Sequence, residues 1–87
     1  SLLTITENNN LIVKAFATAW RYREMYEKCG DVDTVARKVG STPRTIYRFL
    51  DIAYMYPTKV NEILSGKTQV NVNDLFKPEY TPIDFLQ

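Results

Sequence analysis

Residues 31–52 read DVDTVARKVGSTPRTIYRFLDI and predict two short helices joined by a tight turn. Asp31 or Asp33 caps the first helix, because an aspartate side chain accepts a hydrogen bond from the free N–H groups at a helix start. Gly40 ends it, because glycine tolerates the left-handed backbone conformation that commonly closes a helix. The first helix therefore spans barely two turns.

The second helix begins directly after the turn. Thr42 is its predicted N-cap and Pro43 its first residue, where the missing N–H of proline costs nothing. We expect this helix to run from about Thr42 to Ile52. Helices separated by so short a turn must cross steeply, and Ala36 is the small residue expected where they touch. The side chains expected to fill the space between the two crossing helices are Val35, Val39, Ile46 and Phe49. This is the pattern of a helix-turn-helix.

Charge is distributed unevenly along the chain. The 87 residues include 11 Lys and Arg against 10 Asp and Glu, which leaves a formal net charge of only +1. Between Thr34 and Leu50, however, the chain carries four cations and no acidic residue. These cations are Arg37, Lys38, Arg44 and Arg48. One face of a nearly neutral molecule can thus be positive, as contact with a DNA backbone requires.

Outward side chains near the start of the second helix are the predicted contacts to DNA. The guanidinium fork of Arg44 matches two acceptors on guanine, a contact worth about 1–3 kcal/mol of discrimination. Tyr47 and Arg48 lie one turn further on, where base and phosphate contacts are equally plausible. Thr42 and Thr45 offer hydroxyl groups to phosphate, beside the free amides of the helix start. The full predicted set is Thr42, Pro43, Arg44, Thr45, Tyr47, Arg48, Arg37 and Lys38. Each arginine alone is equally well explained as a solvated surface residue, and it is their coincidence with the hairpin that favours DNA.

A long amphipathic helix is predicted ahead of the hairpin, over residues 11–29, with Asn8 to Asn10 capping its start and Gly30 ending it. Its apolar positions recur at steps of three or four. They are Ile12, Phe16, Ala19, Tyr22, Tyr26 and Cys29. Trp20, Tyr22 and Tyr26 suggest a stacking platform for single-stranded nucleic acid, but their helical spacing favours packing in the core.

Further short helices are predicted after the hairpin. Pro57 opens one that ends near Gly66, with Val60, Ile63 and Leu64 facing inward. Asn71 caps a turn that holds Leu75 and Phe76, and Thr81 to Asp84 resembles the start of a last turn. The sequence therefore predicts an all-α fold, a small bundle of about four to five helices containing a helix-turn-helix. We divide it into an N-terminal tail (1–10), the helix-turn-helix core (11–66) and a C-terminal short-helix extension (67–87).

Several function classes are excluded by what the sequence lacks. It has no histidine and a single cysteine, Cys29, so neither a structural zinc site nor an internal disulfide is expected. We interpret Cys29 as a packed apolar residue, and the acidic pair Glu24 and Glu27 as a solvated face rather than a catalytic dyad. No stretch has the roughly 18 consecutive apolar residues of a membrane span. We expect a cytoplasmic protein without cofactor, membrane partner or small-molecule substrate.

Landmarks along the chain share their order and spacing with a known family. They are Leu11 to Ala15 and Trp20-Arg21 in the long helix, Val35 to Gly40 and Tyr47 to Leu50 in the hairpin, then Pro57 to Lys67 and Asp74-Leu75. On these landmarks the run from Leu11 to Gln87 resembles the C-terminal DNA-binding region of bacterial and phage serine recombinases. That region is itself similar to the helix-turn-helix of plasmid-partition proteins.

The resemblance implies a domain that binds the recombination site, while a separate N-terminal domain supplies the serine that cuts DNA. The chain contains no such catalytic domain and lacks an initiating Met, so we expect a targeting piece of a longer protein and not an enzyme on its own. Where the resemblance leads us to expect arginines, near the end of the reading helix, this chain has Phe49, Asp51 and Tyr54.

Two alternatives stay open from the sequence. One is a transcriptional or partition regulator that uses the same helix-turn-helix. The other is a protein-interaction module whose apolar docking face consists of Tyr54, Met55, Tyr56 and Phe85. In the leading interpretation the partner is double-stranded DNA, and useful affinity is expected only when the module pairs with a second copy or is tethered to a catalytic domain.

Overall fold

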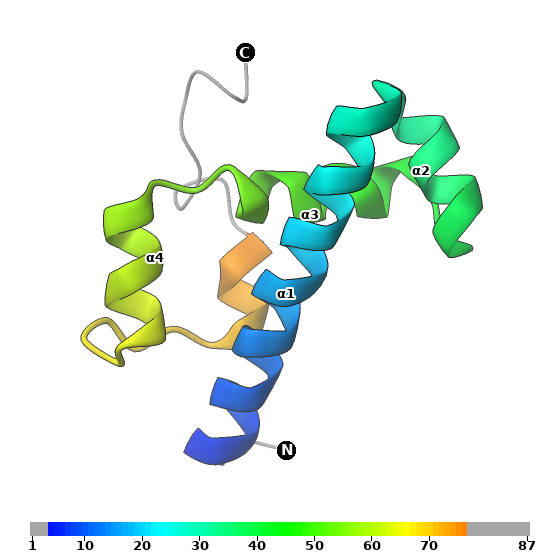
Figure 1. Cartoon of the computed structure of the whole chain (residues 1–87). Helices are drawn as coiled ribbons and strands as arrows, with labels where there is room; N and C mark the ends of the chain where they lie inside the picture. Colours follow the sequence, from blue (N-terminus) through cyan, green and yellow to red (C-terminus); the bar gives the residue numbers. More distant parts are fainter. Residues whose placement is uncertain (1–3, 77–87) are drawn as a thin grey trace.

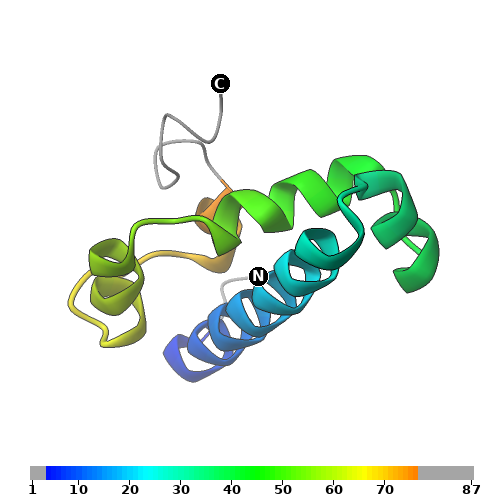
Figure 2. The same ribbon diagram turned by 45° about the horizontal axis from the view of Figure 1, so that its top comes forward.

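The computed structural model describes residues 4–76, which form four α-helices and one 3₁₀ helix (Figure 1). The elements are α1 (Ile5–Cys29), α2 (Val32–Val39), α3 (Pro43–Ala53), α4 (Pro57–Leu64) and η1 (Val72–Phe76). The described residues contain no strand, and the all-α fold class is confirmed. The two views agree that α2 and α4 lie at opposite ends of α3, and α1 crosses α3, in front of it in Figure 1 and below it in Figure 2. The turn predicted at residues 81–84 lies outside the described part.

α1 begins six residues earlier than predicted, so the interpretation of residues 1–10 as a tail was wrong for residues 5–10. Its N-cap is Thr4, whose hydroxyl accepts a hydrogen bond from the Glu7 N–H at 3.1 Å and donates one to the Glu7 carboxylate at 2.9 Å. A threonine three residues ahead of a glutamate is the pattern of a capping box. Because this cap satisfies the helix start, Asn8 to Asn10 continue the helix instead of beginning it.

The core consists of two clusters that share α1. The first joins the N-terminal part of α1 to the end of α3, to α4 and to residues 70–75. Its buried members are Ile12, Ala15, Phe16, Ala19, Ile52, Ala53, Met55, Ile63, Val70 and Leu75. The second cluster joins the C-terminal part of α1 to the hairpin, through Tyr22, Val32, Val35, Ala36, Ile46 and Leu50. Val70 and Leu75, which we had placed in a C-terminal extension, therefore belong to the same core as α1.

Phe49 of α3 connects the two clusters, because it packs against both. Its ring meets the Tyr22 ring edge to face at a centroid distance of 5.3 Å. On its other side it meets Phe76 of η1 in the same way at 5.5 Å. Edge-to-face pairs of this kind stabilise a fold beyond the area they bury. α3 is thus held between α1 and η1 by a row of aromatic rings.

Some side chains predicted to be inside are exposed. Cys29 is exposed at the end of α1, where its thiol lies 3.4 Å from the Asp31 carbonyl oxygen, so its interpretation as a packed apolar residue was wrong. Leu64 is also exposed, because α4 turns Ile63 and not Leu64 toward the core. The Trp20 ring touches Phe16 at a centroid distance of 5.6 Å but is 40% exposed, whereas Tyr22 is buried as predicted.

Candidate nucleic-acid interface

The start of α2 is fixed by Asp31, which settles the choice between Asp31 and Asp33. One carboxylate oxygen accepts a hydrogen bond from the Asp33 N–H at 3.3 Å, and the other accepts one from the Thr34 hydroxyl at 2.6 Å. The hydrogen bond from Thr34 lowers the pKa of the Asp31 carboxyl, because it stabilises the charged form. The sequence had left both aspartates open because aspartate is favoured at a helix start, and the structure places Asp33 in the first turn of α2.

The turn between α2 and α3 is closed by Gly40, with a φ of 71°. A side chain there would meet no atom within 4 Å, so the left-handed backbone, and not a lack of space, calls for glycine. The Ser41 N–H donates to the Ala36 carbonyl oxygen at 2.9 Å. Thr42 then caps α3, its hydroxyl accepting from the Thr45 N–H at 3.3 Å, and Pro43 is the first residue of the helix. These predicted helix limits are confirmed.

Buried side chains hold the two helices in their crossed position. Val35 and Ala36 of α2 are almost fully buried against Ile46 and Leu50 of α3, as the spacing predicts, and Val39 is half-buried at the edge. Because these residues occupy one side of α3, the other side of the helix faces outward. The crossing thus determines which residues α3 presents to a partner.

The outward side of α3 carries Arg44, Tyr47 and Arg48, all of them exposed. Tyr47 is 56% exposed, so its ring is accessible to a partner. Within residues 4–76 the ion pairs join cations of α1 and α4 to acids of the same helix. They leave Arg44 and Arg48 without a carboxylate, so both guanidinium groups point to solvent with all their donors available.

The other residues predicted to contact DNA differ in their exposure and in their hydrogen bonds. Lys38 is exposed and carries no hydrogen bond within the described residues, whereas Arg37 donates to the Thr34 hydroxyl at 3.2 Å on its own helix. Thr42 donates its hydroxyl hydrogen to Thr45 at 3.2 Å, so its proton is used within the cap. The half-buried Thr45 keeps its own hydroxyl hydrogen for a partner. Pro43 is exposed at the helix start and offers only its ring.

Asp51 occupies the same side of α3, one turn beyond Arg48, and was not among the predicted site residues. It is half-buried, and this burial raises the pKa of its carboxyl above the ordinary value of 3.8. No described residue donates a hydrogen bond to the Asp51 carboxylate or forms an ion pair with it. In the sequence Asp51 stands out only as a position where the family resemblance leads us to expect arginine, because its partial burial and its lack of a partner are visible only in three dimensions.

The far end of α3 is held by a network that the sequence did not reveal. The Arg23 guanidinium of α1 donates to the Ala53 carbonyl oxygen at 3.3 Å and lies 3.8 Å from the Glu27 carboxylate. The Tyr54 hydroxyl donates to the same carboxylate at 3.2 Å, and burial together with this bond raises the pKa of Tyr54. α3 has no cation in its own last turn, so Arg23 stabilises its C-terminal carbonyl group from outside.

This network includes Tyr54, one of the four residues of the predicted protein-docking face. The half-buried Tyr54 bonds into it through its hydroxyl, and Met55 is only 4% exposed, so Met55 is not presented to a partner. Tyr56 is exposed, and Phe85 lies outside the described residues. Of the three described residues of the predicted face, Tyr56 is exposed, Tyr54 is half-buried and Met55 is buried.

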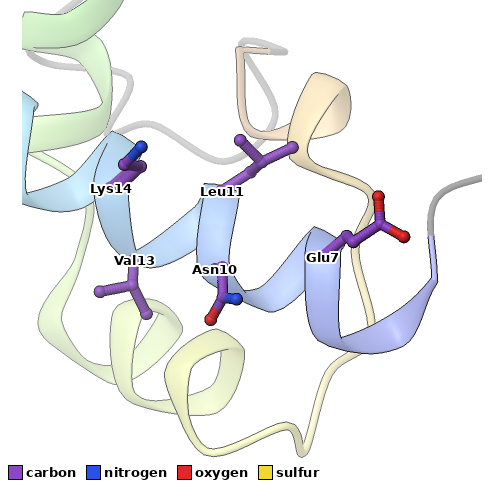
Figure 3. A pocket seen from close by; sticks show the side chains of 5 residues that line it. All are labelled: Glu7, Asn10, Leu11, Val13 and Lys14. Atoms are coloured by element: carbon purple, nitrogen blue, oxygen red, sulfur yellow. The ribbon is translucent and has the colours of Figure 1, made fainter.

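Besides the surface of α3, residues 4–76 form depressions on other helices. One depression, of about 580 Å³, lies on α1. Figure 3 shows its lining side chains diverging around the helix, with Asn10 and Val13 on one side and Leu11 and Lys14 on the other.

Within residues 4–76 no group of three His, Cys, Asp or Glu side chains gathers as metal ligands. None of the described helices has both the length and the apolar character that crossing a membrane requires.

Comparisons with models of protein families, with curated proteins and with solved structures find no match to this chain. The resemblance to the DNA-binding region of serine recombinases consequently stays a prediction from the residues quoted above. What the protein does must be argued from the surface that α2 and α3 build.

Proposed function

We propose that the protein binds double-stranded DNA by placing α3 in the major groove. The observation that carries this proposal is the outward side of α3, where Arg44 and Arg48 are exposed and unpaired within the described residues. A guanidinium without a carboxylate partner keeps its full hydrogen-bonding fork for guanine or phosphate. The steep crossing with α2 leaves this side of α3 projecting, as entry into a groove requires.

The biological setting that we propose is site-specific recombination, with this domain guiding a catalytic domain to its DNA site. This part of the proposal depends on the sequence resemblance alone, and it carries with it a cytoplasmic location in a bacterial or phage-infected cell. A transcriptional or partition regulator uses the same surface in the same way. The full reading frame separates the two, since a preceding domain with a nucleophilic serine belongs to a recombinase.

The first experiment compares single-charge variants on selected DNA. Bound sequences are enriched from a random duplex pool, and fluorescence anisotropy then measures the affinity for the enriched site over a range of salt concentrations. We expect the affinity to fall steeply as salt increases, because bound cations release the counterions of the phosphates. Arg44→Ala should lose about 1–3 kcal/mol on the selected site and relax the preference for guanine at one position.

Two further variants serve as controls. Lys38→Ala should weaken binding to all duplexes alike and reduce the salt slope by about one, as expected for a phosphate contact. Lys14→Ala removes the same charge from the exposed side of α1, outside the hairpin, and should leave binding unchanged. A flat salt response, or equal losses in Arg44→Ala and Lys14→Ala, would contradict the proposal.

A further inference from the structure

Four residues form a stripe along the outward side of α3. Arg44, Tyr47, Arg48 and Asp51 are spaced as i, i+3, i+4 and i+7, which places them in one stripe along the helix. Reading helices that lie along a major groove contact bases from positions with this same spacing. Asp51 is therefore the fourth member of the stripe that the proposed function assigns to DNA.

No contact within residues 4–76 explains a carboxylate at this position. Asp51 lacks a hydrogen-bond or ion-pair partner among the described residues, although Arg48 is three residues away on the same stripe. It stands in the C-terminal half of α3, where the helix dipole disfavours negative charge. It is also half-buried, which costs hydration of the charge. A carboxylate here opposes helix stability and repels phosphate, and a hydrogen-bond donor on a bound partner would offset these costs.

We propose that Asp51 is a specificity-determining residue that accepts a hydrogen bond from the N4 amino group of a cytosine. This inference rests on the proposed function. An ionised carboxylate accepts hydrogen bonds and donates none. In the major groove guanine presents only acceptors and thymine an acceptor and a methyl group, whereas cytosine presents an amino donor. Adenine places an acceptor next to its amino group, which repels a carboxylate.

The spacing of the stripe defines the class of DNA site. Asp51 follows Arg44 by seven residues, which is about 10.5 Å along the helix axis. This distance corresponds to about three base-pair steps of 3.4 Å. The preferred site therefore holds a guanine opposite Arg44 and a cytosine about three base pairs further along the groove, with Tyr47 and Arg48 between them.

The test is selection from a random duplex pool with the wild-type chain, Asp51→Asn and Asp51→Ala. Asparagine pairs with adenine through its amide, so Asp51→Asn should change the selected base from cytosine to adenine. Asp51→Ala should select no base there. Both variants remove the same negative charge. Any gain in affinity that comes only from weaker repulsion of phosphate should therefore be equal in the two variants. We expect the wild type to prefer cytosine about tenfold or more, and each variant to lose that preference.

The outcomes separate this inference from the proposed function. If both Asp51 variants select the wild-type base, or gain affinity equally on every duplex without a change of base, Asp51 does not read DNA. In that case Arg44→Ala still relaxes the guanine preference and the proposed function stands. If the wild type enriches no sequence and binds without salt dependence, the proposed function fails first.

Discussion

At the scale of the residue, Asn8 is the clearest case of a polar side chain that holds the fold together. It is 8% exposed, and its amide donates to the Val70 carbonyl oxygen and accepts from the Val72 N–H, both at 2.8 Å. One side chain thus satisfies two backbone groups that would otherwise be buried without partners. Through them it attaches η1 to α1 and brings Phe76 against Phe49.

Asn8→Ala should lower the free energy of unfolding by about 2–4 kcal/mol, because both backbone groups lose their partner. Urea denaturation followed by circular dichroism measures this loss. Asn9→Ala, at the exposed neighbouring position, is the matched control and should stay within about 0.5 kcal/mol of the wild type. Equal stability of the two variants would show that the Asn8 bridge contributes nothing.

At the scale of the element, the cap of α2 depends on a titrating group. The Thr34 hydrogen bond holds the pKa of Asp31 below 3.8 in the folded chain, while in the unfolded chain the carboxyl has its ordinary value. A depressed pKa stabilises the fold at pH values above 3.8, and this contribution is lost as the pH falls through the lower folded pKa. The hairpin should therefore lose stability in acid through its first residue.

Asp31→Asn tests this pH dependence, because asparagine also caps helices but carries no charge. The wild type should melt at a higher temperature than the variant near neutral pH, and the difference should shrink below pH 3.8. Thermal melts at a series of pH values measure it. Asp33→Asn removes the neighbouring carboxylate, whose side chain makes no hydrogen bond in the described residues, and should keep the pH dependence of the wild type. A difference that stays constant with pH would rule out the Asp31 carboxylate as the cause.

Sequence signals predicted the hairpin well and its surroundings poorly, for a physical reason. Asp31, Gly40 and Thr42 each act on backbone groups within a few residues, so their effect can be predicted from the chain. Asn8 bonds to groups more than 60 residues away, and Arg23 caps a carbonyl 30 residues away, so neither partner is visible in the sequence. Contacts of this range exist only once the helices have packed.

The site shows the same division between local and distant causes. The exposure of Arg44 and Arg48 was predictable, because a helix with a regular apolar stripe turns its other side outward. The start of α1 was also within reach, since Thr4 and Glu7 have the spacing of a capping box. Asp51 was not, because residue type alone does not show that a carboxylate is half-buried without a donor.

At the scale of the whole molecule, stability depends on the connection between the two clusters. Phe49 packs against both of them and lies between Tyr22 and Phe76. α3, which carries the candidate interface, therefore has its orientation fixed from α1 on one side and from η1 on the other. Loss of the ring would remove the aromatic contacts of α3 with Tyr22 and Phe76, while Ile52 and Ala53 would still pack in the same cluster as Leu75 of η1.

Phe49→Ala should reduce the free energy of unfolding by about 3 kcal/mol, the lower end of the range for phenylalanine, because the ring is only partly buried. Chemical denaturation gives the value. Tyr47→Ala removes an exposed ring from the same helix and should change stability by about 0.5 kcal/mol or less. If the two aromatic truncations cost the same, Phe49 does not join the clusters.

The length of α1 has a practical consequence for biochemical work. Its 25 residues extend for about 37 Å, and they separate the start of the helix from the hairpin (Figure 1). An affinity tag, dye or chip linker attached ahead of Thr4 is thus kept far from Arg44. Immobilisation through that end leaves the candidate interface open to solution.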